Sequence, residues 1–192
     1  FNNPMGACPR CDGLGVISFF DPGRVVTFPH LSLGSGAIKG WDRRNQFYFQ
    51  MLASLAAHYQ FDIEAPFENL PRDIQEVILN GSGKEKVRFV YLGERGTKYQ
   101  REHPFEGIIP NLERRYRETD SAVVREELAK YLNSQPCPQC EGTRLRREAR
   151  HVKVAGKTIY QVSGLPLKEA QTFFEGLVLP GHKQAIAEKI VK

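Results

Sequence analysis

Apolar positions recur along this chain with two different spacings, and each spacing predicts a type of element. Between Asp42 and Tyr59 they return every three or four residues, which predicts one helix with a wide apolar face. We assign the aromatic residues of this helix to the core rather than to a ligand platform. Further helices are expected to begin at Pro71, Pro110, Ser121, Pro166 and Gln184.

A spacing of two residues predicts strands elsewhere. Lys86–Leu92 alternates between apolar and polar residues, and Gly93–Gly96 is expected to turn the chain back along a partner strand. Ala155-Gly156-Lys157 is a second hairpin signal, because glycine supplies the positive φ that tight hairpin turns need. The ranges that we expect to form strands are 16–20, 86–92, 97–101, 151–154 and 158–162.

Together these elements predict an α+β fold in three parts. Residues 21–132 form a compact α+β insertion domain, in which 25–40 is a loop. The insertion interrupts a zinc-binding module made of 1–20 and 133–155, and 156–192 begins a helical region. The side chains expected in the core of the insertion are Phe47, Met51, Leu55, Val77, Phe89, Ile108, Leu112 and Leu128. Those expected to face inward after Pro166 are Ala170, Phe173, Phe174 and Leu177.

The four cysteines of the chain lie in two matching hexapeptides, one on each side of the insertion. Both hexapeptides read Cys-Pro-x-Cys-acid-Gly. The two-residue spacing lets both thiolates of a tight turn reach one metal ion, and the glycine suits the positive φ of a knuckle. We therefore predict one structural zinc ion in tetrahedral coordination by Cys8, Cys11, Cys137 and Cys140.

Two other uses of paired cysteines are open to this pattern. A pair of disulfides would suit a small secreted domain, but the N-terminus has no signal peptide. Redox chemistry would need a nucleophilic cysteine at a helix N-terminus after a strand, whereas glycine and basic or aliphatic residues follow each pair here. The matched hexapeptides favour one shared metal site over both.

Composition narrows the class of protein further. The chain has 192 residues with 41% hydrophobic content and a net charge of +5, so it can bury a core and has a mild preference for anionic partners. It has no apolar run of membrane-spanning length, and we expect a reducing, cytoplasmic setting with no membrane contact. Because the chain begins at Phe1 without methionine, we interpret it as a fragment.

Basic residues cluster after the second cysteine pair, where a metal would hold them at fixed spacing. Arginine forks suit phosphate oxygens, so this cluster is a candidate contact to a nucleic-acid backbone. A solvated or interdomain face is the alternative. The residues of the cluster are Arg144, Arg146, Arg147, Arg150 and Lys153. A further phosphate track is expected from Lys39, Arg43 and Arg44, with Arg95, Lys98 and Arg101 on the hairpin.

No catalytic constellation is visible in the sequence. Gly81–Lys84 resembles the end of a phosphate-binding loop, but Ile78 and Glu85 stand where that loop needs glycine and a hydroxyl residue. The five histidines are scattered, and none stands beside a nucleophile. We expect no enzyme activity from this stretch alone.

Four strings of residues, in this order, closely resemble the UvrA family, the damage-sensing subunits of bacterial excision nucleases. They are Phe1–Gly15, Gly40–Asn45, His103–Gly107 and Cys137–Arg146. The resemblance extends over the whole chain and implies an internal fragment of a DNA-repair ATPase of the ABC type. It implies a zinc-containing signature region, with residues 156–192 as its helical start, interrupted by the insertion domain of the family.

The resemblance also implies partners and cofactors. These are damaged double-stranded DNA, a UvrB-type repair protein, a second copy of the parent protein, and ATP that the parent binds outside this fragment. In this family a cysteine pair before Phe1 is a further source of zinc ligands, although the count of four within the chain favours a self-contained site.

Three functions are compatible with these features. The first is a DNA-binding and interdomain-coupling module with structural zinc and contacts that do not depend on base sequence. The second is a purely structural or protein-interaction module. The third is a chaperone-like zinc module, because Cys8–Gly15 fits the CxxCxGxG unit of DnaJ-type proteins. That family repeats the unit four times and this chain has one full copy, so this interpretation ranks last.

Overall fold

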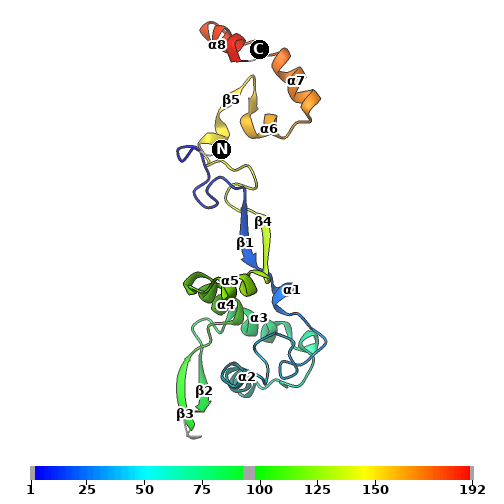
Figure 1. The fold of residues 1–192 in the computed structure, drawn as a ribbon, viewed down its shortest axis with the longest axis vertical. Coiled ribbons are helices and arrows are strands. Elements are labelled where there is room, and N and C mark those ends of the chain that lie inside the picture. Colours follow the sequence, from blue (N-terminus) through cyan, green and yellow to red (C-terminus); the bar gives the residue numbers. More distant parts are fainter. Residues whose placement is uncertain (1–2, 93–97, 191–192) are drawn as a thin grey trace. The chain divides into compact units, whose positions relative to one another are not determined.

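The computed structural model describes residues 3–92 and 98–190. The chain divides into two compact units, one formed by Phe19–Asn133 and the other by Phe1–Ser18 with Ser134–Lys192. The turn expected at Gly93–Gly96, and with it Arg95, lies outside the described residues. Strand β1 (Val16–Phe20) pairs with β4 (Leu132–Pro136) in a two-stranded sheet (Figure 1). The expected strand at 16–20 is therefore confirmed.

The Phe19–Asn133 unit combines helices with one antiparallel hairpin. Strand β2 (Lys86–Leu92) pairs with β3 (Lys98–Pro104), with Phe89 opposite Arg101 and Tyr91 opposite Tyr99. In Figure 1 helix α2 lies beside this hairpin. The helices of the unit are α1 (Pro22–Val25), α2 (Gln46–Tyr59), η1 (Phe67–Asn69), α3 (Arg72–Asn80), α4 (Ile108–Glu118) and α5 (Ala122–Ala129).

One apolar core fills this unit, and most of the expected core residues belong to it. The expected residues that are buried are Leu55, Phe89, Ile108, Leu112 and Leu128, while Met51 and Val77 pack against the core partly buried. Trp41 is 2% exposed and stacks on Tyr48 with ring centroids 4.1 Å apart. Helix α5 begins directly after Ser121, close to the expected start, and the Ser121 side chain caps it by accepting a hydrogen bond from the Val124 N–H.

Helix α2 differs from the expectation in its start and in its buried face. The helix begins at Gln46 rather than near Asp42, because the side chain of Asn45 caps it. Asp42 lies before the helix, where its buried carboxylate accepts a hydrogen bond from the Arg44 N–H. The buried face carries Leu52 and Leu55 together with smaller residues. Phe47 was expected in the core, and this prediction is wrong: its side chain is 54% exposed.

Two other segments of the unit depart from the expectation. The stretch 25–40 is irregular as expected, but it also contributes Val25, Leu33 and Ile38 to the core. An isolated β-bridge joins Val26 to Ile38 within it. Helix α5 ends at Ala129 rather than at Leu132, because Leu132 begins strand β4.

The second unit contains short elements. They are η3 (Ala149–His151), β5 (Lys153–Val154), β6 (Lys157–Thr158), α6 (Ile159–Ser163), α7 (Leu167–Glu175) and α8 (His182–Ile190). The hairpin around Ala155-Gly156 is confirmed in shorter form, with both turn residues at positive φ. The prediction of a strand at 158–162 is wrong beyond Thr158, because residues from Ile159 onward are helical. The Thr158 and Gln161 side chains form a capping box that starts helix α6 there.

The inward face expected after Pro166 is not buried in this structure. Helix α7 has no buried residue, and Phe174 is 41% exposed. Among the described residues, no helix has both the length and the apolar character needed to cross a membrane.

Candidate metal centre

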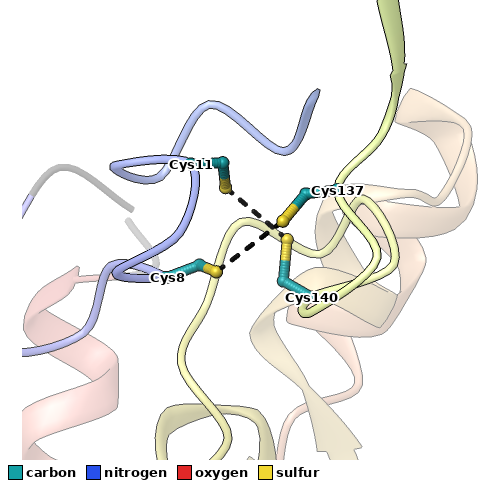
Figure 2. A group of neighbouring side chains, drawn as sticks. All are labelled: Cys8, Cys11, Cys137 and Cys140. Carbon is teal, nitrogen blue, oxygen red and sulfur yellow. Dashed lines mark hydrogen bonds between the residues drawn. The ribbon is translucent and has the colours of Figure 1, made fainter. Parts of the chain in front are cut away.

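The four cysteine side chains converge on one point although their two pairs are far apart in the sequence (Figure 2). All four sulfur atoms lie within 4.8 Å of one another and all four residues are buried. The Sγ atoms of Cys8 and Cys137 are 4.0 Å apart, and those of Cys11 and Cys140 are 3.7 Å apart. A metal with four sulfur ligands at about 2.3 Å requires sulfur separations of roughly 3.8 Å. The cluster therefore has the dimensions of a tetrahedral metal site.

The two cysteine knuckles share one backbone conformation. Asp12 and Gly13 follow the first pair with φ of 48° and 75°, and Glu141 and Gly142 follow the second with φ of 53° and 82°. The expected positive φ at both glycines is confirmed. The repeated Cys-Pro-x-Cys-acid-Gly sequence thus folds twice into the same turn.

Reciprocal backbone hydrogen bonds hold the two knuckles together. The Cys8 N–H donates to the Arg144 carbonyl at 2.9 Å, and the Cys137 N–H donates to the Gly15 carbonyl at 2.8 Å. Gly15 and Arg144 each stand four residues beyond the second cysteine of their own pair. These two positions were not among the predicted site residues, although their equal spacing was a signal. These two bonds hold the knuckles side by side, with their cysteine side chains directed to one point.

Hydrogen bonds to sulfur favour the thiolate form that metals require. The Gly15 N–H donates to the Cys11 Sγ at 3.2 Å. Burial acts to raise the pKa of Cys137, but hydrogen bonds from the backbone of Cys140 and Gln139 outweigh it and lower the pKa to about 7. For Cys140 burial dominates and raises the pKa to about 11, with the neighbouring cysteine sulfurs acting in the same direction. A bound cation would favour the thiolate form of the cysteines that hold it.

Four clustered cysteines can therefore hold one metal ion. A set of four sulfur ligands in tetrahedral arrangement suits zinc or iron, and hard cations such as magnesium prefer oxygen ligands. Because no sulfur faces open solvent, the site would be closed and structural rather than open for catalysis.

The basic cluster after the second knuckle is brought to the same site, and part of it is bonded locally. Arg144 Nε donates to the Leu14 carbonyl at 3.4 Å, and Arg146 Nη1 donates to the Met5 carbonyl at 3.4 Å. Arg146 also lies 3.3 Å from the Glu148 carboxylate, whose pKa is lowered by its own backbone N–H and by Arg146 and Arg147. Arg150 donates to the Gln139 carbonyl at 3.3 Å. Three of the five side chains thus also brace the knuckles.

The remaining two residues of the cluster, Arg147 and Lys153, have exposed side chains. Arg144 has φ of 69°, in the left-handed region that glycine favours, and Gly15 occupies the equivalent position of the other knuckle. A non-glycine residue at such a position costs about 1 kcal/mol relative to glycine.

The second candidate track lies in the other unit and is largely neutralised. Arg43 forms an ion pair with Glu64 at 2.6 Å, and its guanidinium lies 5.6 Å from the Phe49 ring. Arg44 makes a two-point contact with the buried Asp42, at 3.0 and 2.6 Å. That contact lowers the pKa of Asp42. Lys39 is exposed. The charges of Arg43 and Arg44 are therefore balanced within the fold.

Comparison with known proteins gives consistent matches. The family model described as the UvrA DNA-binding domain matches residues 21–130. The UvrABC system protein A of Neisseria meningitidis serogroup A is 62% identical over 192 residues, which cover 100% of this chain and 20% of that protein. The protein of the same name from Escherichia coli K12 is 57% identical over the same length, again 20% of that protein.

A solved structure matches as well. The crystal structure of UvrA2 from Deinococcus radiodurans aligns with a TM-score of 0.66 and 26% sequence identity. The alignment covers 99% of this chain and 26% of that one. The chain thus spans about a fifth of the length of the curated relatives it matches.

Proposed function

The chain belongs to the UvrA family, and from this premise we propose that it is a zinc-stabilised, DNA-binding segment of a nucleotide excision repair protein. Residues 21–132 are the inserted DNA-binding domain, and 1–20 with 133–155 form the zinc module. Residues 156–192 begin the signature region of the ATPase half. The observation that carries the proposal is the convergence of four buried cysteines beside an arginine cluster, next to a stretch that matches a DNA-binding family model.

The metal in this proposal is zinc, held by Cys8, Cys11, Cys137 and Cys140. The closed, buried set of four sulfurs suits a structural zinc ion, which has no open position for a substrate. Zinc would hold the two knuckles together, and with them the two strands that lead into and out of the insertion. Movements of the ATPase half would reach the inserted domain through this junction.

The DNA contact in this proposal is to phosphates and not to base edges. Arg144, Arg146 and Arg147 have the largest share, Arg150 and Lys153 support them, and Lys39, Arg43 and Arg44 contribute less because two of these three are ion-paired. Counterion release then makes the affinity for duplex DNA strongly salt-dependent and nearly independent of sequence. The partner is damaged double-stranded DNA.

The activities of the parent protein are assigned by family. We infer that ATP is bound by the parent outside this segment, which has no nucleotide-binding loop of its own. The same inference gives the parent a UvrB-type partner, a homodimeric state and a place in the bacterial cytoplasm.

One observation favours a second candidate function, a purely structural module. The guanidinium groups of Arg144 and Arg146 donate to carbonyl groups of the first knuckle, which is a use that needs no DNA. The two candidates differ in what the exposed Arg147 does, since it projects from the same segment without such a bond among the described residues.

A salt titration of duplex binding by the full-length protein separates the two candidates. Replacing Arg147→Glu should weaken binding about tenfold and reduce the slope of log affinity against log salt by about 1. Arg144→Gln and Arg146→Gln should act in the same direction but also lower the zinc content, because these side chains brace the knuckles. Lys168→Glu, which makes the same charge change at an exposed position of α7, is the matched control and should alter neither quantity. An unchanged slope and affinity for Arg147→Glu would assign the cluster to the structural function.

A further inference from the structure

The Phe19–Asn133 unit, which contains the match to the UvrA DNA-binding domain family, has no excess of positive charge. Residues 19–133 hold 16 lysines and arginines against 16 aspartates and glutamates, so the entire net charge of +5 belongs to the other unit. Several of its cations are also paired, including Arg88 with Glu102 and Arg114 with Glu106. Bulk electrostatic attraction is therefore a weak source of DNA affinity here. A local feature of another kind is required.

A row of stacked aromatic rings runs across α2 and the β2–β3 hairpin of this unit. The rings of Phe47 and Tyr91 have centroids 5.7 Å apart and an interplanar angle of 25°. The rings of Tyr91 and Tyr99, which are paired across the hairpin, are 5.4 Å apart at 23°. Three near-parallel rings from three elements thus form one continuous stack, and these elements lie together in Figure 1.

Both ends of the row are open to solvent while its centre is fixed. Phe47 is 54% exposed and Tyr99 is 46% exposed, but Tyr91 is only 8% exposed. The Tyr91 hydroxyl lies 2.9 Å from His103 Nε2, and His103 Nδ1 lies 2.8 Å from the Pro104 carbonyl. This chain of hydrogen bonds places the proton on Nδ1 and lets the Tyr91 hydroxyl donate to Nε2. Because the rings are already held in place, binding of a planar ligand would lose little side-chain conformational entropy.

A guanidinium group accompanies the exposed end of the row. Arg101 Cζ lies 5.7 Å from the centroid of the Tyr99 ring, and the two residues share one face of β3 because they are two positions apart. Arg101 is exposed, and among the described residues it has no carboxylate partner in an ion pair. Its neighbour Glu102 is on the opposite face and pairs with Arg88. Exposed rings beside an available guanidinium offer a surface for a base and a contact for its phosphate.

We propose that Phe47, Tyr91, Tyr99 and Arg101 form a stacking site for an unpaired or unstacked base of damaged DNA. The inference rests on the proposed DNA-binding function and adds a ligand subsite to it. Stacking on an aromatic ring tolerates any base, because every base has a π-face. Lesions and mismatches lower the cost of unstacking a base, so such a site favours distorted over intact duplex without reading its sequence.

Photocrosslinking tests the site directly on the full-length protein. The probe is a duplex with a three-nucleotide unpaired bubble that carries 5-iodo-2′-deoxyuridine at its centre, and crosslinked peptides are identified by mass spectrometry. We expect crosslinks to Tyr99 or Phe47. Combining Phe47→Leu with Tyr99→Leu should reduce these crosslinks and the preference for bubble over intact duplex by about tenfold. Affinity for intact duplex and its salt slope should not change.

The matched control is Phe28→Leu, which removes an exposed ring of the same unit that is 44% exposed and lies outside the row. It should leave the crosslinks and the bubble preference as in the unmodified protein. Thermal melting of both variants checks folding, and Tyr99→Phe, which keeps the ring, should retain the crosslinks.

Three results would overturn the inference. If crosslinks map elsewhere, or persist in the double variant while duplex binding is intact, the stacking site is wrong. The proposed function would not be affected by that result. A double variant that keeps the bubble preference but loses association with another repair protein would make the row a protein-docking surface. Failure of the unmodified protein to bind duplex or bubble at all would instead remove the proposed function and this inference together.

Discussion

At the scale of single residues, the tightest constraint in the Phe19–Asn133 unit is the close approach of two backbone segments at Gly81 and Gly107. Both residues have positive φ, of 97° and 89°. A Cβ atom on Gly107 would lie 2.5 Å from the Asn80 carbonyl carbon and from the Gly81 nitrogen. A Cβ atom on Gly81 would lie 2.6 Å from the Phe105 carbonyl oxygen. Backbone atoms cannot move aside as a flexible side chain can, so the end of α3 and the start of α4 depend on both glycines.

Gly107→Ala should therefore lower the stability of this unit by more than its unfavourable φ alone accounts for. The left-handed backbone costs a non-glycine residue about 1 kcal/mol, and the clash should raise the total to roughly 3 kcal/mol or more. Thermal unfolding of the two variants measures this difference. Gly83→Ala is the matched control, because Gly83 also has positive φ, of 61°, but no atom lies within 4 Å of its Cβ position. Equal losses for both variants would show that the close approach relaxes freely.

At the scale of elements, helix α2 docks on strand β2 through a hydroxyl group as well as through apolar side chains. Ser54 is 9% exposed, and its Oγ donates to the Gln50 carbonyl at 2.9 Å within the helix. The same Oγ accepts a hydrogen bond from the Val90 N–H of β2 at 3.1 Å. Leu52 and Leu55 fill the interface on either side of this bond with no exposed surface. One hydroxyl group thus links the backbone of the helix to the backbone of the strand.

Ser54→Ala should destabilise the junction of α2 and β2 by about 1 kcal/mol, because the Val90 N–H loses its acceptor in a partly buried place. Hydrogen exchange at the Val90 amide should become faster in the variant. Ser163→Ala in α6 removes an exposed hydroxyl with the same type of bond to the carbonyl four residues earlier, and it should leave the exchange at Val90 unchanged. Unaltered exchange at Val90 in Ser54→Ala would mean that water replaces the hydroxyl without cost.

The sequence predicted the types and approximate places of most elements, because their signals are local. The alternation of 86–92 and the proline before α3 are patterns of single elements, and both recur in the structure. The buried face of α2 could not be predicted in this way. Phe47 and Tyr48 each begin a row of apolar residues spaced by four. Packing on β2 buries Leu55 from the first row and Leu52 from the second, but it leaves Phe47 at the surface. The exposed ring of Phe47 stacks on the ring of Tyr91 instead.

The start of α6 was missed for a different reason. Thr158 to Val162 contains residues that favour strands, and the turn before it does form a hairpin. The reciprocal bonds between Thr158 and Gln161 end the strand at once and begin the helix. The convergence of the four cysteines was predictable because the two sequence repeats are alike. The reciprocal bonds that join the two knuckles were not, because they link residues that are far apart in the chain.

At the scale of the whole molecule, the two units are stabilised by different means. Among the described residues, the apolar core of 22 buried side chains lies wholly within Phe20–Leu128. The other unit, within its described part, buries only the four cysteines and Leu145 as hydrophobic residues. A unit with so little apolar burial cannot offset the entropy of its own chain, so it needs a further source of stability. The cysteine cluster is the available source.

Zinc removal should therefore unfold one unit and spare the other. We expect the purified 192-residue chain to hold one zinc per chain by metal analysis, with binding that contributes about 10 kcal/mol to the folding of the knuckles. Addition of a chelator should accelerate hydrogen exchange in the segments around Cys8 and Cys140, while α2 and β2 keep their protection because their core holds no metal ligand. Cys140→Ser should show the same pattern without chelator, and Gln139→Ser, an exposed neighbour that is not a ligand, should not. If both units lose protection in a single transition, the large apolar core also depends on the metal. If the purified chain is folded but contains no zinc, the fold does not require the metal.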